Sequence, residues 1–319
     1  MGFFYMQNSS FYSKNIRMLK HLFLIFLSLF YISASYADVK GKVLNDLSGK
    51  ISSTLGSLIP GEGVTEVSVQ VSDFIGGSIG TEEDNPDFEI LGVRDILSKE
   101  NSNLFTQFSI HDQEINKDQR FIGNLGLGYR TLNDDESMMY GGNIFWDHDI
   151  PRGHQRIGLG LEVKASILDF SYNQYIKATN QKIIKGTKEQ VLGGHEYNVS
   201  TQVPYMPWST FNLQGYRWNN ERVTKDQEGY VYSLENTLTP SLQLNVEFDN
   251  SSVAGVKDQY NYELVFVYPP RENKASLTKK AISSFAFEKK NMQASLKDKV
   301  RRNNNLTVEI QGSVIFTSK

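Results

Sequence analysis

The residues that decide the fold read NLGLGYRTL (residues 124–132) and MMYGGNIFWDHDIPRGHQRIGLGLEV (residues 138–163). In both stretches an apolar residue occupies every second position. Over residues 156–165 the apolar set is Ile157, Leu159, Leu161, Val163 and Ala165, and the other set is Arg156, Gly158, Gly160, Glu162 and Lys164. A period of two places these sets on opposite faces of a β-strand. The pattern therefore predicts strands with one apolar and one polar face.

The same period recurs along the chain from residue 64 onwards. We predict twelve strands, near residues 64–72, 85–93, 102–112, 120–131, 137–149, 154–165, 167–178, 191–203, 208–219, 229–238, 241–250 and 258–269. Most approach the roughly 9 to 11 residues of a tilted membrane-crossing strand, and their number is even, as in bacterial single-chain barrels. A soluble sandwich would show the same alternation. Strand length, a 12% aromatic content and the export signal described next favour an all-β fold, a twelve-stranded antiparallel transmembrane β-barrel.

The first residues of the chain have the order of an export signal. Lys14, Arg17 and Lys20 precede an apolar run at residues 22–32, which is followed by the small-residue site around Ala37. We predict a signal peptide at residues 1–37. The chain has no cysteine, so an exported product must be stable without disulfides.

Three further regions follow the signal. Residues 38–62 are predicted to be a periplasmic segment whose residues 42–58 form a short amphipathic helix, because Leu44, Leu47, Ile51, Leu55 and Leu58 are spaced by three and four. Residues 63–270 are assigned to the barrel, and residues 271–319 to a basic linker or plug. Residues 271–302 contain ten Lys or Arg against three acidic residues, a net charge of +7. Such asymmetry indicates an anionic partner for this region.

We expect that partner to be the lumen of the barrel. The register predicts a charged lumen set, Arg130, Arg156, Glu162, Lys164, Glu247, Asp249 and Glu263, and the linker supplies Lys279, Lys280, Lys289 and Lys290. Attraction between the linker lysines and the lumen carboxylates would seat the linker in the pore, and replacing the four lysines by Gln should raise conductance. A solvated tail, or one held by other anions, is the alternative.

Two other groups of residues are candidates for a role in the barrel, one in the lumen and one at a turn. Gly126, Gly128, Gly158 and Gly160 fall on the lumen side, where they either leave room for the plug or let the strands bend. Asp147, Asp149, Arg152 and His154 lie at a strand end and are expected to form a charged cluster that fixes a turn.

No catalytic signature stands out in the sequence. Barrel phospholipases and omptin-like proteases need a His within a defined constellation, and neither His148 nor His154 lies in one. Metal-ligand spacing, a phosphate loop and a nucleotide fingerprint are also lacking. We therefore expect no enzymatic activity, no cofactor and no nucleic-acid partner.

Three blocks of sequence carry a family resemblance: LFTQFSIHDQEINKDQRFIGNLGLGYR (residues 104–130), GGNIFWDHDIPRGHQRIGLGLE (residues 141–162) and VRRNNNLTVEI (residues 300–310). In this order they resemble the β-domain of inverse autotransporters, the intimin and invasin family, over residues 42–310. The resemblance implies a twelve-stranded outer-membrane barrel whose following segment returns through the pore and carries an adhesive passenger to the cell surface. Nine residues follow Ile310, so we expect no passenger adhesin domain within this chain.

The leading interpretation is an outer-membrane translocator and anchor that threads its own C-terminal segment through its pore. Its expected partners are outer-membrane lipid, the barrel-assembly machinery and periplasmic chaperones. The alternative is a plugged, porin-like or structural barrel without secretion activity.

Overall fold

The computed structural model describes residues 63–72, 87–222, 226–251, 259–310 and 313–315, together with Lys50 and Ser53. The chain separates into two compact units, Met1–Leu44 and Asn45–Lys319, and every described residue belongs to the second. The predicted signal peptide lies outside the described residues. Of the predicted helix at residues 42–58, only Lys50 and Ser53 are described, and both are helical.

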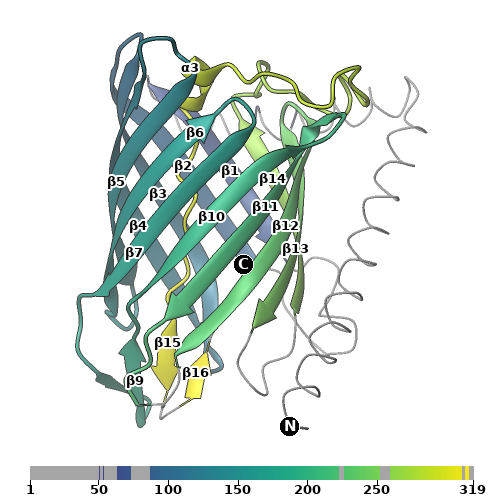
Figure 1. Ribbon diagram of the computed structural model, residues 1–319. Coiled ribbons are helices and arrows are strands. Elements are labelled where there is room, and N and C mark those ends of the chain that lie inside the picture. The colour runs from purple at the N-terminus through teal and green to yellow at the C-terminus, as the bar shows by residue number, and fades with distance from the viewer. Residues whose placement is uncertain are drawn as a thin grey trace, which may run out of the picture. The chain divides into compact units, whose positions relative to one another are not determined.

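Among the described residues, twelve strands close into an antiparallel barrel (Figure 1). The strands are β1 (Val64–Ser72), β2 (Asp87–Ser98), β3 (Ser102–Ile115), β4 (Asp118–Leu132), β5 (Met138–Asp149), β6 (Gln155–Ala165), β7 (Leu168–Lys177), β10 (Gly194–Val203), β11 (Met206–Trp218), β12 (Gln227–Thr239), β13 (Leu242–Ser251) and β14 (Gln259–Tyr268). β1 pairs with β14 from Val67↔Tyr268 to Ser72↔Glu263 and closes the barrel. The twelve predicted strands are thus confirmed.

The alternation of the strands separates an outer from an inner surface. In β6, Leu159 is 43% and Leu161 65% exposed, whereas Arg156, on the inner face of the same strand, is fully buried. In β4, Leu125, Leu127 and Tyr129 are exposed in the same way. Closure pairs every strand with two neighbours, so the backbone needs no hydrogen bonds from the surrounding medium. The exposed apolar side chains can therefore face lipid, and the polar set lines the lumen.

The two ends of the barrel differ in their connections. At one end, which we call the turn end, the strands are joined at residues 99–101, 133–137, 166–167, 204–205 and 240–241. At the other, the loop end, the connections are residues 73–86, 116–117, 150–154, 178–193, 219–226 and 252–258. Most connections at the loop end are longer than those at the turn end, but the β3–β4 hairpin has a connection of two residues, Asn116 and Lys117. Their φ values are 55° and 58°. Two successive left-handed residues form the type I′ turn that suits twisted strands.

A second, small sheet lies at the loop end (Figure 1). Its order is β16 (Ser313–Ile315), β15 (Val308–Ile310), β9 (Thr187–Val191) and β8 (Lys182–Ile184). The hairpin β8–β9 belongs to the connection between β7 and β10, whereas β15 and β16 follow the barrel in sequence. Sequence periodicity did not reveal β8 and β9, because strands of three to five residues show too little alternation.

The described helix α3 (Met292–Ser295) is a single turn, and the side chain of Asn291 caps it by accepting from the Gln293 amide. No described helix combines the length and the apolar character needed to cross a membrane.

Candidate translocation pore

The chain after β14, residues 269–310, is called the C-terminal segment here, and part of it lies inside the barrel. Asn103, Gln107 and Gln113 follow one another along the lumen face of β3, from the turn end to the loop end. Asn103 Nδ2 donates to the Leu296 carbonyl (3.2 Å), Gln107 Oε1 accepts from the Val300 amide (2.7 Å), and Gln113 Oε1 accepts from the Leu306 amide (2.9 Å). The segment therefore runs parallel to β3 through the lumen, as the yellow trace in Figure 1 shows.

Other wall amides bind the same backbone. Asn173 of β7 donates to the Arg301 carbonyl (2.9 Å) and Asn124 of β4 to the Asn304 carbonyl (3.1 Å). Gln113 binds Leu306 twice, since its Nε2 also donates to the Leu306 carbonyl (2.9 Å). A side-chain amide carries both a donor and an acceptor, so it can bind a peptide group whatever its side chain is. The β3, β4 and β7 wall thus binds an extended backbone.

A buried charge cluster in the lumen surrounds Asp147 of β5. Arg302 Nη2 donates to both of its oxygens (2.7 and 2.9 Å), and Arg156 Nε donates at 2.8 Å. The side chains of Asp147 and Arg156 are fully buried, and that of Arg302 is 1% exposed. Arg156 also lies over the ring of Tyr175, 4.1 Å from its centroid, and donates to the Asn303 carbonyl (2.9 Å). One carboxylate therefore joins β5, β6 and the segment.

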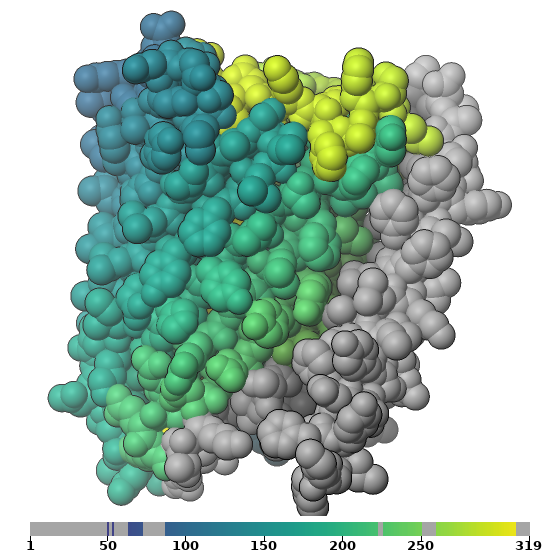
Figure 2. Space-filling model, in the orientation of Figure 1, coloured from purple at the N-terminus to yellow at the C-terminus, as the bar shows by residue number. Residues whose placement is uncertain are grey.

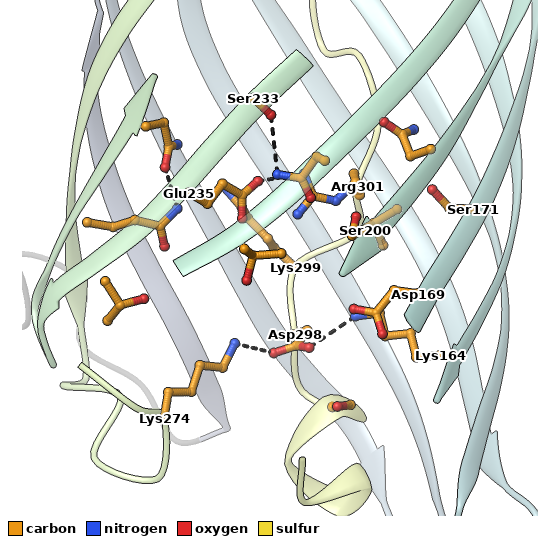
Figure 3. A pocket seen from close by; sticks show the side chains of 18 of the residues that line it. Lys164, Asp169, Ser171, Ser200, Ser233, Glu235, Lys274, Asp298, Lys299 and Arg301 are labelled. Atoms are coloured by element: carbon orange, nitrogen blue, oxygen red, sulfur yellow. Dashed lines mark hydrogen bonds and ion pairs between the residues drawn. The ribbon is translucent and has the colours of Figure 1, made fainter. Parts of the chain in front are cut away.

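A second group of ion pairs lies nearer the turn end (Figure 3). Asp298 of the segment pairs with Lys164 (3.0 Å) and with Lys274 (2.6 Å). Arg301 pairs with Glu235 of β12 (2.5 Å). Successive residues of an extended chain point in opposite directions, so Arg301 reaches β12 while Arg302 reaches β5 across the lumen.

Two further ion pairs lie in the lumen: one joins two strands of the wall, and the other joins the C-terminal segment to the wall. Arg130 Nε donates to Glu162 (2.7 Å), and its Nη1 donates to the Leu296 carbonyl (3.1 Å) and to the Asp298 carbonyl. Arg271, just after the last strand, pairs with Glu66 of β1 at 2.7 Å.

The lumen glycines make room for aromatic rings. A Cβ at Gly126 would lie 2.3 Å from the Phe145 ring, and one at Gly128 would lie 2.4 Å from the Phe105 ring. Guanidinium groups lie over these rings: that of Arg302 is 4.2 Å from the ring centroid of Phe145, and that of Arg130 is 4.3 Å from the ring centroid of Phe105. At Gly158 the nearest atom to an added Cβ is Nη2 of Arg302, at 3.3 Å. The glycines thus permit cation–π contacts between the wall and arginines of the lumen.

Gly160 makes room for amides instead. An added Cβ there would lie 2.4 Å from Oδ1 of Asn143 and 2.6 Å from Oδ1 of Asn173.

Most of the linker lysines are placed differently from the sequence-based expectation. Lys279 pairs with Glu272 and Lys280 with Glu288, both within the C-terminal segment. The hydrogen bond from Lys280 lowers the pKa of Glu288. Lys290 pairs with Asp169 at the rim (2.9 Å), and Lys289 is exposed. Three arginines of the segment that were not predicted, Arg271, Arg301 and Arg302, also pair with carboxylates of the wall, and Lys274 pairs with Asp298 of the segment itself.

The other predicted lumen carboxylates lie on β13 and β14. Glu263 accepts from Asn245 Nδ2 (2.5 Å), and Asp249 accepts from the Tyr216 hydroxyl (3.1 Å). Glu247 lines the same lumen cavity as Glu263. The structure brings together Arg130, Arg156, Glu162 and Lys164 with the segment, but it places these three carboxylates beside other wall residues.

The predicted turn cluster is divided. The Arg152 amide donates to Asp149 Oδ1 (3.1 Å), which fixes the β5–β6 turn, and Arg152 also pairs with Asp118 (2.9 Å). Asp147 belongs to the lumen cluster, because two residues earlier in the strand it lies deeper in the barrel. His154 Nε2 lies 3.5 Å from Glu189, and burial lowers the pKa of His154. Among the described residues, no group of three His, Asp or Glu side chains could hold a metal ion.

A cavity of about 440 Å³ remains beside the segment (Figure 3). Its lining on β7 and β10–β14 includes carboxylates such as Glu235 and Glu263 beside many amide and hydroxyl side chains. Several of them are at least nine-tenths buried and have a polar atom without a protein partner: Ser171 Oγ, Asn198 Nδ2, Gln202 Nε2, Asn212 Oδ1 and Asn261 Oδ1. Buried polar atoms need partners, so this wall is suited to water or to a polar occupant.

The family model of the inverse autotransporter β-domain matches residues 34–304. The chain belongs to this family. It is 31% identical over 146 residues to a putative attaching and effacing protein homolog of Escherichia coli K12, covering 43% of this chain and 48% of that one. It is 30% identical over 123 residues to an invasin of Yersinia enterocolitica, covering 38% of this chain and 14% of that one. The chain thus spans less than half the length of these curated relatives.

The fold is also found among solved structures. One such structure is described as "Unveiling the Mechanism Behind the in-meso Crystallization of Membrane Proteins". It superposes on this chain with a TM-score of 0.62 at 18% sequence identity, over 77% of this chain and 99% of that one. The family and the barrel together place the protein in the bacterial outer membrane. The resemblance seen in the three sequence blocks is confirmed.

Proposed function

We propose that this inverse autotransporter β-domain is a translocator and anchor that passes its own C-terminal segment through its pore to the cell surface. The observation that carries the proposal is the continuous set of hydrogen bonds between wall amides and the backbone of residues 296–306, from the turn end to the loop end. Recognition of backbone, with few demands on side chains, is what a pore needs if many different residues are to pass through it.

The orientation follows from the connections. Outer-membrane barrels have short periplasmic turns and longer extracellular loops, so we assign the turn end to the periplasm and the loop end to the cell surface. The segment then enters from the periplasm and emerges at the β8–β9 hairpin, where β15 pairs with β9 from Val308↔Val191 to Ile310↔Glu189. This added strand would hold the emerging chain at the surface.

The amide side chains of the cavity on β10 and β11 give further support. Asn198 and Gln202 on β10, and Asn212 on β11, are side chains of the kind that binds the segment's backbone on the opposite wall, and each has an amide atom without a protein partner. Gln202 Oε1 already accepts from the Glu288 amide of the segment (3.2 Å), so amide side chains that can bind backbone lie on both sides of the lumen.

A plugged, porin-like barrel is the second candidate, and the ion pairs of Arg301 and Arg302 with the wall, the second of them buried, favour it. A segment fixed by such pairs can close the pore whether or not anything is secreted. The two functions differ in where the chain after β16 lies in the cell.

Labelling of single cysteines in intact cells tests the proposal, because the natural chain has none. With a membrane-impermeant maleimide, we expect Ser318→Cys to react without permeabilisation. Lys188→Cys, exposed at the loop end, should react in the same way, and Asp134→Cys, exposed at the turn end, should react only after permeabilisation. Reaction of Ser318→Cys only after permeabilisation, with both controls as expected, would contradict threading and support the periplasmic tail.

A further inference from the structure

The C-terminal segment contains a stretch with the composition of a membrane-surface peptide. Residues 279–290 read KKAISSFAFEKK, in which an apolar centre with two phenylalanines lies between two pairs of lysines. The stretch has a net charge of +3. We call these twelve residues the rim segment.

The lumen does not account for the apolar residues of the rim segment. Ile282 is 48%, Phe285 68% and Phe287 42% exposed. The apolar residues on either side of the rim segment, Leu277 and Leu296, are each 3% exposed. Clustered exposed aromatic side chains on a soluble surface usually mark a contact with a partner or a membrane. The rim segment therefore has an apolar surface that the pore does not use.

Two backbone hydrogen bonds attach the rim segment to the turn end of the barrel. The Ser283 amide donates to the Tyr205 carbonyl (2.8 Å), and the Tyr205 amide donates to the Ala286 carbonyl (2.9 Å). Tyr205 lies in the β10–β11 turn and is itself 51% exposed. Figure 2 shows residues of the C-terminal segment at the molecular surface along this end of the barrel.

The lipid-facing surface of the barrel continues up to the same place. Leu168, at the start of β7, is 51% exposed, and it lies opposite Thr201 of β10. Its neighbour Ile167 is 43% exposed and accepts a hydrogen bond from Thr201 Oγ1 (2.9 Å). Tyr205 follows four residues after Thr201. The apolar outer surface of β7 and β10 is thus adjacent to the turn that holds the rim segment.

We propose that the rim segment lies in the boundary between headgroups and acyl chains of the periplasmic leaflet of the outer membrane. Ile282, Phe285 and Phe287 would enter the apolar side of this boundary, as aromatic residues do at membrane surfaces. The flanking lysines would face the phosphates of anionic glycerophospholipids. The lysine pairs with Glu272 and Glu288 are at least 30% exposed on both sides, so water and lipid phosphate can both reach them. This contact is independent of threading and holds for a plugged barrel as well.

Depth-dependent quenching of a fluorescent label tests the proposal. Phe285→Cys and Phe287→Cys, each labelled with NBD, are reconstituted in phosphatidylcholine and phosphatidylglycerol vesicles that contain a lipid with a spin label near its headgroup. Asp134→Cys at another turn and Glu272→Cys earlier in the segment, both exposed, are the matched controls. We expect labels at 285 and 287 to be quenched at least about twofold more strongly than at the controls. Heat-dependent electrophoretic mobility shows that each variant is folded.

Equal quenching at all four positions, or protection of positions 285 and 287 from aqueous iodide without lipid quenching, would overturn the proposal, and the second result would indicate a protein partner. A further arm tests the charges. Lys279→Gln, Lys280→Gln and Lys289→Gln combined should reduce lipid quenching at position 285 in vesicles with the anionic lipid and leave it unchanged in phosphatidylcholine alone. An unchanged signal in both kinds of vesicle would overturn the electrostatic part.

Discussion

Replacing Arg271, Lys274, Arg301 and Arg302 together by Gln should raise the single-channel conductance of the reconstituted barrel at least about twofold, with frequent transitions between closed and open levels. These four cations pair with Glu66, Asp298, Glu235 and Asp147 of the lumen and the segment. Without them Glu66 and Glu235 lose these ion pairs with the segment, and Asp147 and Asp298 keep only their cationic wall partners, Arg156 and Lys164. Breaking the buried Arg302 pair costs about 3 to 5 kcal/mol, whereas the half-exposed pairs of Lys274 and Arg301 contribute about 0 to 1 kcal/mol each.

The remaining attachment of the segment consists mainly of amide hydrogen bonds, each worth about 0.5 to 1.5 kcal/mol. The segment should therefore leave its place for part of the time and open the pore. The matched control removes the same number of charges through Lys279→Gln, Lys280→Gln, Lys289→Gln and Lys290→Gln. Because Lys279, Lys280 and Lys290 pair locally or at the rim and Lys289 is exposed, their loss should leave conductance near that of the natural protein. Equal conductance for the two quadruple variants would contradict the assignment of the seating contacts.

The largest loss of stability for a single substitution is expected for Asp147→Ala. The change removes the acceptor of Arg156, Arg302 and the Asn124 amide, and it leaves two buried guanidinium groups without a counter-charge. We expect the free energy of unfolding, measured by urea titration in lipid vesicles, to fall by about 3 to 5 kcal/mol.

Asp169→Ala is the matched control for this substitution. Asp169 also pairs with a cation of the segment, Lys290, but the two side chains are 23% and 30% exposed, and pairs of this kind contribute about 0 to 1 kcal/mol. In the double variant Asp147→Ala and Arg302→Ala, the loss should be smaller than the sum of the single losses, because the second change removes one of the unpaired charges. Additive losses would show that Asp147 and Arg302 do not act as a pair.

The strands could be predicted from sequence because a closed barrel imposes the same requirement on each of them. One face must suit lipid and the other water, and the alternation at Arg156, Leu159 and Leu161 follows directly. The hairpin β8–β9 was missed because its pairing with β15 depends on residues more than 100 positions away. A three-residue strand such as Lys182–Ile184 has no period of its own that could reveal it.

The candidate site was predictable in its wall but less so in its segment. Arg130, Glu162 and Lys164 were assigned to the lumen by register, and they do lie there. The seating cations were assigned to the lysines at 279, 280, 289 and 290, because net charge over a window does not show which charges have local partners. Glu272 and Glu288 are close enough in sequence to pair with Lys279 and Lys280. Alternation at Arg301 and Arg302, which point to opposite walls, was the signal that could have identified two of the correct cations.

The central claim is that the C-terminal segment lies in the lumen with Leu306 at the loop end of β3. A disulfide trap tests it directly, since the chain is free of cysteine. Gln113 and Leu306 share two hydrogen bonds and are both buried, so Gln113→Cys with Leu306→Cys should form a disulfide within one chain in growing cells. The mismatched pair, Gln113→Cys with Leu277→Cys, should not, because Leu277 is bound to Thr237 near the turn end. A matched pair that stays reduced under oxidant, while each cysteine alone reacts with a small thiol reagent, would contradict the account.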